Sequence, residues 1–223
     1  MGFKLRVRVE YEKGSDIRFL SHLDMVRLWE RLIRRSGVQV KLSQGFNPHL
    51  KLSLGTVLPV GVWGRHEYLD FEMDQDASSA ELHDKLASQA PPGLTISRVA
   101  RINDNEPSLM SMVNTARYRI SLHNGADVDR IINDIKKSQE VLVERKNKNK
   151  TIDIKPGILD LRFNYSDGQC EIDTSLASDS QGGVRLADFI EALVERGLPR
   201  EVIKDAWREG NFIRQGEVWR SPL

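Results

Sequence analysis

The residues best suited to chemistry are two histidines and an aspartate at the edges of predicted elements. His22 and Asp24 follow Ser21 at the start of a predicted helix, and His49 ends a polar loop. A helix start has free N–H groups and the positive end of the dipole, which favour anions and lower the pKa of an imidazole. His22 is therefore predicted to contact a phosphate or to act as a neutral general base.

The same residues allow two other interpretations. If His22 and His49 converge, they form an acid/base pair, or a metal site with Asp24, although neither spacing is diagnostic of a metal. Ser21 with Asp24 three residues later also fits a capping box, in which case His22 only packs. We name His22, His49 and Asp24 as catalytic candidates and predict no metal and no cofactor.

Basic side chains form a row on the predicted helix 22–36. Their spacing places them on one face, opposite a broad apolar face. Arginine forks suit phosphate oxygens, so the row indicates a polyanion surface. The alternative is a solvated face with a Glu30–Arg34 pair. The residues of the row are Arg27, Arg31, Arg34 and Arg35, and Arg18 precedes the helix.

The loop 43–49 combines a stacking ring with amide and imidazole groups between two lysines. Loops of this composition are suited to reading unpaired bases. The alternative is a structural turn with Phe46 packed into the core. The predicted contacts are Lys41, Gln44, Phe46, Asn47 and Lys51.

A second basic segment covers residues 144–150 and continues into 153–156. Its Lys/Asn composition is typical of a turn between strands, and such basic turns contact nucleic-acid backbones or are simply exposed. The predicted contacts are Arg145, Lys146, Lys148, Lys150 and Lys155.

The number of cysteines and the length of the apolar runs exclude several classes of protein. Cys170 is the single cysteine, so internal disulfides, thiolate zinc sites and three-cysteine iron–sulfur clusters are excluded, and its place in a predicted strand indicates a buried structural thiol. No apolar run approaches the roughly 20 residues of a membrane span. The alternating N-terminus is typical of a strand and not of a signal peptide, so we expect a cytoplasmic protein.

Charge is uneven although the net charge is +1. Residues 1–60 carry 11 Lys/Arg and 5 Asp/Glu, whereas residues 61–92 carry 2 and 7. This distribution predicts either an electropositive face for a polyanion or pairing of the two regions within the molecule.

The elements that position these residues follow the order β-α-β-β-α-β, which then partly repeats. We predict an α+β fold of two ferredoxin-like domains in tandem, with antiparallel sheets and helices on one face. The domains are 1–104 and 114–223, with a polar linker between them. In the second domain we expect a hairpin at 159–165 and 169–174, helices at 186–195 and 200–207, and a final strand near 212–219.

The segments 18–24, 43–49 and Leu58-Pro59-Val60-Gly61 resemble the bacterial radical-SAM-linked protein family, a domain of unknown function. Residues 145–148 and 153–156 are similar to the second half of that family, so the resemblance spans the whole chain. One departure is Leu50, where the family usually has a second proline. The resemblance implies a radical-SAM partner with a cobalamin-binding-type domain and an RNA context, but no catalytic residues.

These observations lead to one principal hypothesis and two alternatives. The principal hypothesis is an RNA-binding accessory protein that presents structured RNA, tRNA or rRNA, to a radical-SAM modification enzyme. The first alternative is a metal-independent endoribonuclease that uses His22 or His49. The second is a protein-only adaptor for the radical-SAM partner, with the acidic stretch 67–76 as its docking surface.

Overall fold

The computed structural model describes residues 5–123, 127–145, 150–166, 169–178 and 183–223. The N-terminal half has the predicted element order. It consists of β1 (Leu5–Lys13), α1 (His22–Ser36), β2 (Leu52–Leu54), β3 (Trp63–Met73), α2 (Ser79–Ala87) and β4 (Leu94–Ile102). Its strands lie in the order β4-β1-β3 with β2 beside β3, and all these pairs are antiparallel. After α1 the chain forms an isolated bridge between Val40 and Met73 before it reaches β2.

Helix α1 begins and ends where the sequence predicts. Ser21 and Asp24 form the capping box, and Gly37 ends the helix with a φ of 71°, which glycine adopts without strain. The apolar face buries Met25, Trp29 and their neighbours one turn on. Local signals were therefore sufficient to define this helix.

The C-terminal half contains a second set of strands and helices. It consists of α3 (Leu109–Met112), β5 (Thr115–Leu122), α4 (Val128–Lys137), β6 (Leu142–Arg145), β7 (Lys150–Asp153), β8 (Ile158–Ser166), β9 (Gln169–Ala177), α5 (Leu186–Glu195), β10 (Ile203–Gln215) and β11 (Val218–Arg220). Strands β6 and β7 pair only with each other and form a separate hairpin. Cys170 is buried in β9, and burial raises the pKa of its thiol, as expected for a structural cysteine.

The predicted helix at 200–207 is wrong. Residues Arg200–Val202 form one 3-10 turn, and the chain then continues as β10 for 13 residues. Strand β10 pairs with β5 on one side and with β3 on the other. Pairing on both sides satisfies backbone groups of this segment and outweighs its weak local preference for a helix.

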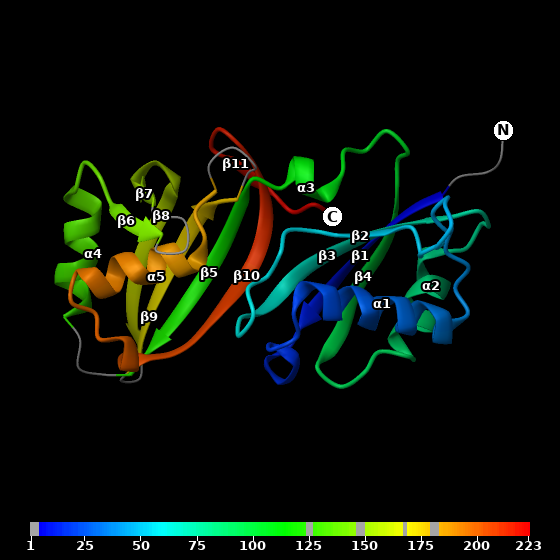
Figure 1. Cartoon of the computed structure of the whole chain (residues 1–223), viewed down its shortest axis with the longest axis horizontal. Coiled ribbons are helices and arrows are strands. Elements are labelled where there is room, and N and C mark those ends of the chain that lie inside the picture. Colours follow the sequence, from blue (N-terminus) through cyan, green and yellow to red (C-terminus); the bar gives the residue numbers. More distant parts are fainter. Residues whose placement is uncertain (1–4, 124–126, 146–149, 167–168, 179–182) are drawn as a thin grey trace.

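The two halves share one sheet, where we expected two. The described strands form a nine-stranded sheet (Figure 1). Seven of them follow the path β4-β1-β3-β10-β5-β9-β8, while β2 pairs with β3 and β11 pairs with β10 beside this path. The halves meet where β10 runs parallel to β3, with Trp207 opposite Trp63 and Arg208 opposite Gly64. The two tryptophan rings stack at this point with centroids 5.1 Å apart. The structure is thus a mixed α+β fold on a mostly antiparallel sheet.

Each half has its own apolar core between its helices and the sheet. Val7 and Val9 of β1 join buried residues of α1 and α2 in one core, and Ile120 of β5 joins residues of α4 and α5 in the other. The opposite side of β1 is covered by the C-terminal segment, because buried Arg8 donates from Nη1 to the carbonyl of Pro222 at 2.9 Å. Among the described residues, no helix is long and apolar enough to cross a membrane.

Candidate functional site

A buried ion pair lies at the junction of the two halves. Arg208 donates from Nε to Oε1 of Glu67 at 2.7 Å, and Nη2 also donates to the carbonyl of Thr56 at 2.8 Å. Burial lowers the pKa of Arg208, but Glu67 and Tyr118 together raise it by more, so the pKa lies above its ordinary value and the guanidinium stays charged. The pair therefore fixes the loop 55–62 over the junction.

Lys13 fixes a second segment at the same place. Its buried ammonium donates to the carbonyls of Arg18 at 3.1 Å and Leu20 at 2.8 Å, and burial lowers its pKa. The N–H of Gly61 donates to the Arg18 carbonyl at 3.0 Å. Two of the segments that carry the sequence resemblance, 18–24 and 58–61, therefore meet at the junction.

The catalytic candidates do not come together. His22 lines a small cavity beside Lys13 and Glu67. Nδ1 of His49 instead lies 3.6 Å from Glu30, which is about 12 Å further along α1 than His22 at 1.5 Å per residue. No cluster of three or more metal-ligating side chains occurs among the described residues.

Asp24 has a structural role. Its carboxylate accepts from the Ser21 hydroxyl at 2.6 Å and from the Ser21 N–H at 3.2 Å, and these hydrogen bonds lower its pKa. This is the capping-box interpretation. Arg18 extends toward the C-terminal half, where Nη1 lies 3.6 Å from Asp205.

The arginine row of α1 is exposed. Arg27 lies 3.6 Å from Asp24, and Arg35 donates to the carbonyl of Gln89 at 3.3 Å. Arg31 and Arg34 form no ion pair with another described residue, so the Glu30–Arg34 pair of the alternative interpretation is not seen there. These side chains remain available to bind an external anion.

The loop 43–49 protrudes from the molecule. Ser43 closes its base, because its N–H donates to the carbonyl of His49 at 2.8 Å and its hydroxyl accepts from the His49 N–H at 3.0 Å. Gln44 and Asn47 are exposed, and Phe46 is fully exposed. The alternative of a buried Phe46 is wrong.

The lysines on either side of this loop are paired. Nζ of Lys41 lies 2.6 Å from Asp74, and Nζ of Lys51 lies 2.8 Å from Glu72. Deeper in the sheet, buried Arg8 binds Asp70 at 2.7 Å. Some charges of the basic region 1–60 and the acidic region 61–92 are therefore paired within the molecule, whereas the arginine row of α1 stays exposed.

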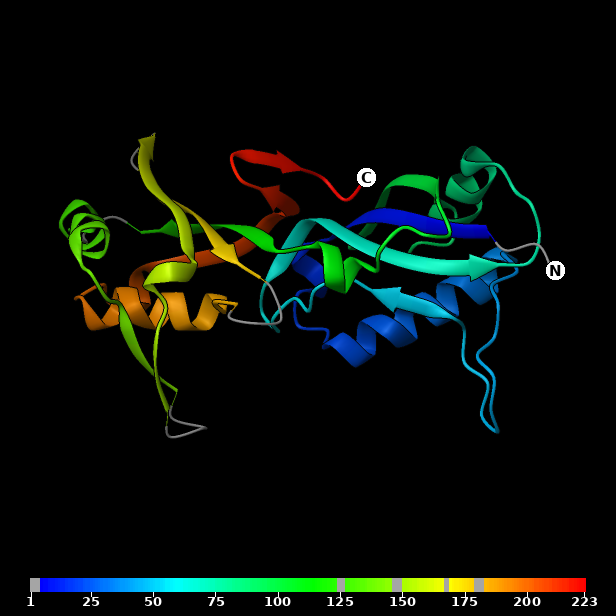
Figure 2. The same cartoon turned by 90° about the horizontal axis from the view of Figure 1, so that it is seen from above.

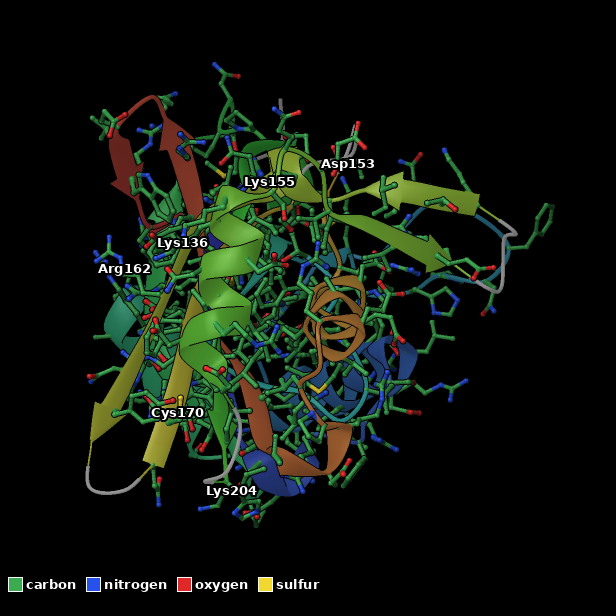
Figure 3. All side chains as sticks on the ribbon, turned by 90° about the vertical axis from the view of Figure 1, so that its left-hand side faces the viewer. Lys136, Asp153, Lys155, Arg162, Cys170 and Lys204 are labelled. Carbon is green, nitrogen blue, oxygen red and sulfur yellow. The ribbon has the colours of Figure 1, made fainter. Side chains whose placement is uncertain are left out.

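The basic hairpin divides into structural and exposed residues. Nζ of Lys155 donates to the carbonyls of Ile135 at 2.6 Å and Lys136 at 2.8 Å, so this lysine caps the C-terminal end of α4 instead of facing solvent (Figure 3). Lys150 is exposed on β7. The predicted contacts Lys146 and Lys148 lie outside the described residues.

Asp153 orders the base of the hairpin. Its Oδ1 accepts from the N–H groups of Val141 at 2.8 Å and Lys155 at 2.9 Å. Figure 3 shows Asp153 at the base of the hairpin, near Lys155 at the end of α4. The segment 153–156 therefore positions β7 and α4 relative to each other.

An open groove of about 760 Å³ lies between the hairpin, the start of α5 and the loop 55–62. It is lined by residues of both halves, including Val57, Pro59, Arg145, Lys150, Arg185 and Arg208. The groove is thus next to the junction and shares Arg208 with it.

Arg185 and Asp188 were not predicted from the sequence. Asp188 is buried and accepts from Nε of Arg185 at 2.9 Å and from Nε of Arg145 at 3.1 Å. The available signal was the i, i+3 spacing of Arg185 and Asp188 at a helix start, which is weak by itself. The pairing with Arg145 depends on the hairpin and was not visible in the sequence.

Several of these features face the same way. Figure 2 shows α1, α5, the loop between α1 and β2, and the β6–β7 hairpin on one side of the sheet. The loop and the hairpin protrude at the two ends of this side, and we call it the helical side. It carries the arginine row, Phe46 and the groove.

Comparison with known sequences and structures gives one informative match. Residues 6–186 match the family described as "Uncharacterized protein conserved in bacteria (DUF2344)". No curated protein matches the sequence. A solved structure described as "Crystal Structure of an Unknown Protein from Galdieria sulphuraria" has 11% identity over 87% of this chain and 91% of that chain. Its TM-score of 0.27 is too low to support any argument about this fold.

Proposed function

For this chain, which belongs to the bacterial family DUF2344, we propose the role of an RNA-binding accessory protein that serves a radical-SAM enzyme in tRNA or rRNA modification. The radical-SAM partner, with its cobalamin-binding-type domain, is proposed from the resemblance of segments 18–24, 43–49 and 58–61 alone. The RNA-binding part has independent support from the surface of the molecule.

One observation supports RNA binding above all others. Helix α1, the loop 43–49 and the β6–β7 hairpin lie on the helical side (Figure 2). They carry the exposed arginine row, the fully exposed Phe46, and Arg145 with Lys150, respectively. Guanidinium groups bind phosphate oxygens, and an exposed ring stacks on an unpaired base. A surface that offers both, at separated points, suits a folded RNA with single-stranded loops.

We also infer that the chain is built from two ferredoxin-like units. The order β4-β1-β3-β2 in the first half corresponds to β10-β5-β9-β8 in the second, and each half has two helices packed on one core. The β6–β7 hairpin is then an insertion between α4 and β8.

The two alternatives have less support. An endoribonuclease that used His22 and His49 as an acid/base pair would need both at one phosphate, but His49 lies 3.6 Å from Glu30, so only one of the two histidines could act there. A protein-only adaptor that docks through residues 67–76 would need free carboxylates. In that stretch Asp70 binds Arg8, and Asp76 lies 2.6 Å from Arg101.

The test is binding of labelled tRNA and rRNA fragments across a salt series, with the triple variant Arg31→Ala, Arg34→Ala, Arg35→Ala. Each phosphate contact adds about 0.7–0.9 to the slope of log affinity against log salt, so loss of three contacts should lower the slope by about 2. Running the same samples on a denaturing gel reports cleavage directly.

The matched control is Lys136→Ala, Lys137→Ala, Lys204→Ala, which removes the same charge from exposed sites on the C-terminal half. Figure 3 shows Lys136 and Lys204 at the end of the molecule formed by that half. Equal salt slopes for both triple variants would contradict binding through α1. Cleaved RNA that depends on His22 or His49 would instead support the ribonuclease.

A further inference from the structure

The groove beside the junction is lined by charged side chains, which we call its charged end, and by apolar side chains, which we call its apolar wall. Its cations are Arg145, Lys150, Arg185 and Arg208. Among the described residues, the carboxylate that lines it is that of Asp153, whose Oδ1 already accepts two backbone N–H groups. The apolar wall is formed by Val57, Pro59, Ile152, Ile154, Val184 and Leu186.

Arg145 and Arg185 form the centre of the charged end. Both donate from Nε to the buried Oδ2 of Asp188, at 3.1 Å and 2.9 Å. One carboxylate is thus shared by two guanidinium groups, which leaves a net positive charge. Asp188 also restricts both side chains, so little side-chain entropy is lost when they bind a ligand.

The two guanidinium groups have donors to spare. An arginine has five N–H donors, and the bonds to Asp188 use Nε and Nη2 of each. Nη1 of each has no hydrogen bond to another described residue. The first-turn N–H groups of α5, at Leu186 and Ala187, lie at the same edge and lack intrahelical partners by geometry.

The dimensions suit a ligand with one flat apolar part and one anionic part. A groove of about 760 Å³ lies within the range of about 300–1,000 Å³ that is usual for small-molecule sites. A nucleotide has this composition, since its base can pack on an aliphatic wall while its phosphate accepts from arginine forks.

We propose that the groove holds one unpaired nucleotide of the bound RNA, with its phosphate between Arg145 and Arg185 and its base against the apolar wall. This inference rests on the RNA-binding role proposed above. It assigns a specific site to the hairpin and the start of α5, whereas the arginine row of α1 supplies contacts to the RNA backbone.

The test uses Ala187→Glu, which adds a carboxylate to the groove without removing any internal contact. Ala187 is exposed at the second position of α5, where an acidic residue favours the helix. The matched control is Ala80→Glu, which makes the same change at the second, exposed position of α2. Ala187→Gln separates bulk from charge, and thermal unfolding verifies that each variant is folded.

Binding of adenosine 5′-monophosphate, adenosine, inorganic phosphate and a single-stranded RNA 12-mer is measured by calorimetry for each variant. We expect adenosine 5′-monophosphate to bind more tightly than adenosine or phosphate. Because the added carboxylate repels a phosphate and competes for the donors of Arg145 and Arg185, Ala187→Glu should weaken its binding at least about tenfold. Ala80→Glu should leave it unchanged.

The outcomes separate this inference from the proposed function. If RNA binds to the wild type but Ala187→Glu and Ala80→Glu behave alike, the groove inference fails and the RNA-binding role stands. If the mononucleotide binds in the groove but no RNA binds, the groove does not hold a nucleotide of RNA and its ligand is a free nucleotide. Equal binding of inorganic phosphate and the mononucleotide would overturn the role of the apolar wall.

Discussion

Arg208 of β10 and Glu67 of β3 form an ion pair, with side chains 1% and 4% exposed, at the point where the two halves share a sheet. The same guanidinium donates to the carbonyl of Thr56, and it also lines the groove. One residue therefore connects the continuity of the sheet, the position of the loop 55–62 and the floor of the proposed nucleotide site.

We predict that Glu67→Gln strongly destabilises the protein. The substitution leaves Arg208 charged and buried without its carboxylate, which typically costs about 3–5 kcal/mol. Urea unfolding gives the change in free energy. The control is Arg65→Gln, which breaks the more exposed pair with Glu209 at 3.1 Å and should cost less than about 1 kcal/mol. A similar small loss for both variants would show that the buried pair does not hold the halves together.

Asp188 should make stability depend on pH in the acid range. Burial raises its pKa, but hydrogen bonds from Arg185 and Arg145 outweigh burial, so the pKa lies below its ordinary value of 3.8. As pH falls, Asp188 therefore takes up a proton in the unfolded chain before it does so in the folded protein. The stability that the carboxylate contributes is complete above the unfolded pKa and is lost as pH falls through the folded pKa.

The corresponding variant is Asp188→Asn. It should be less stable than the wild type at pH 7, and the difference in free energy of unfolding should narrow below about pH 4. Urea unfolding at pH 7 and pH 3 measures this difference. Asp134→Asn serves as the control, because its pair with Arg196 at 3.0 Å is exposed on the Asp134 side. If the difference in free energy of unfolding is the same at both pH values, the pKa of Asp188 is not lowered in the folded protein.

Gly157 is predicted to be required by packing. A Cβ at this position would lie 2.3 Å from Cγ2 of Val184, a residue of the groove wall. Gly157→Ala should therefore cost about 1–3 kcal/mol by overpacking. Combining it with Val184→Ala should relieve the clash, so that the double variant is more stable than the sum of the two single changes. If the free-energy changes of the two single variants simply add, the contact with Val184 is not what destabilises Gly157→Ala.

Phe46 is predicted to act in binding and not in folding. Because the ring is fully exposed, Phe46→Ala should change the free energy of unfolding by less than about 0.5 kcal/mol. A stacked base is worth about 1–3 kcal/mol, so RNA affinity should fall about five- to 150-fold. Phe46→Leu keeps an apolar side chain without the ring. If Phe46→Leu binds RNA like the wild type, stacking is not the contact.

The sequence predicted the features that depend on short-range signals. The bounds of α1 followed from Ser21, Asp24 and Gly37, and the buried state of Cys170 followed from its place in a strand. The exposed arginine row of α1 followed from helical spacing. Roles that depend on distant partners were not predicted. Lys155 was predicted to contact RNA but instead caps the C-terminal end of α4. Lys41 was also predicted to contact RNA, and it pairs with Asp74, which directly follows β3.

The sequence by itself determined the α+β composition, the helix of arginines and the polar loop around Phe46, because capping, periodicity and turn residues act within a few positions of one another. Only the tertiary structure decided that β10 is a strand, that it joins both halves in one sheet, and that Arg145 and Arg185 share Asp188 in a groove. These features arise from pairs such as Glu67 and Arg208, which are 141 residues apart. These features are stabilised by burial and by strand pairing between distant segments, which a local pattern of residues cannot indicate.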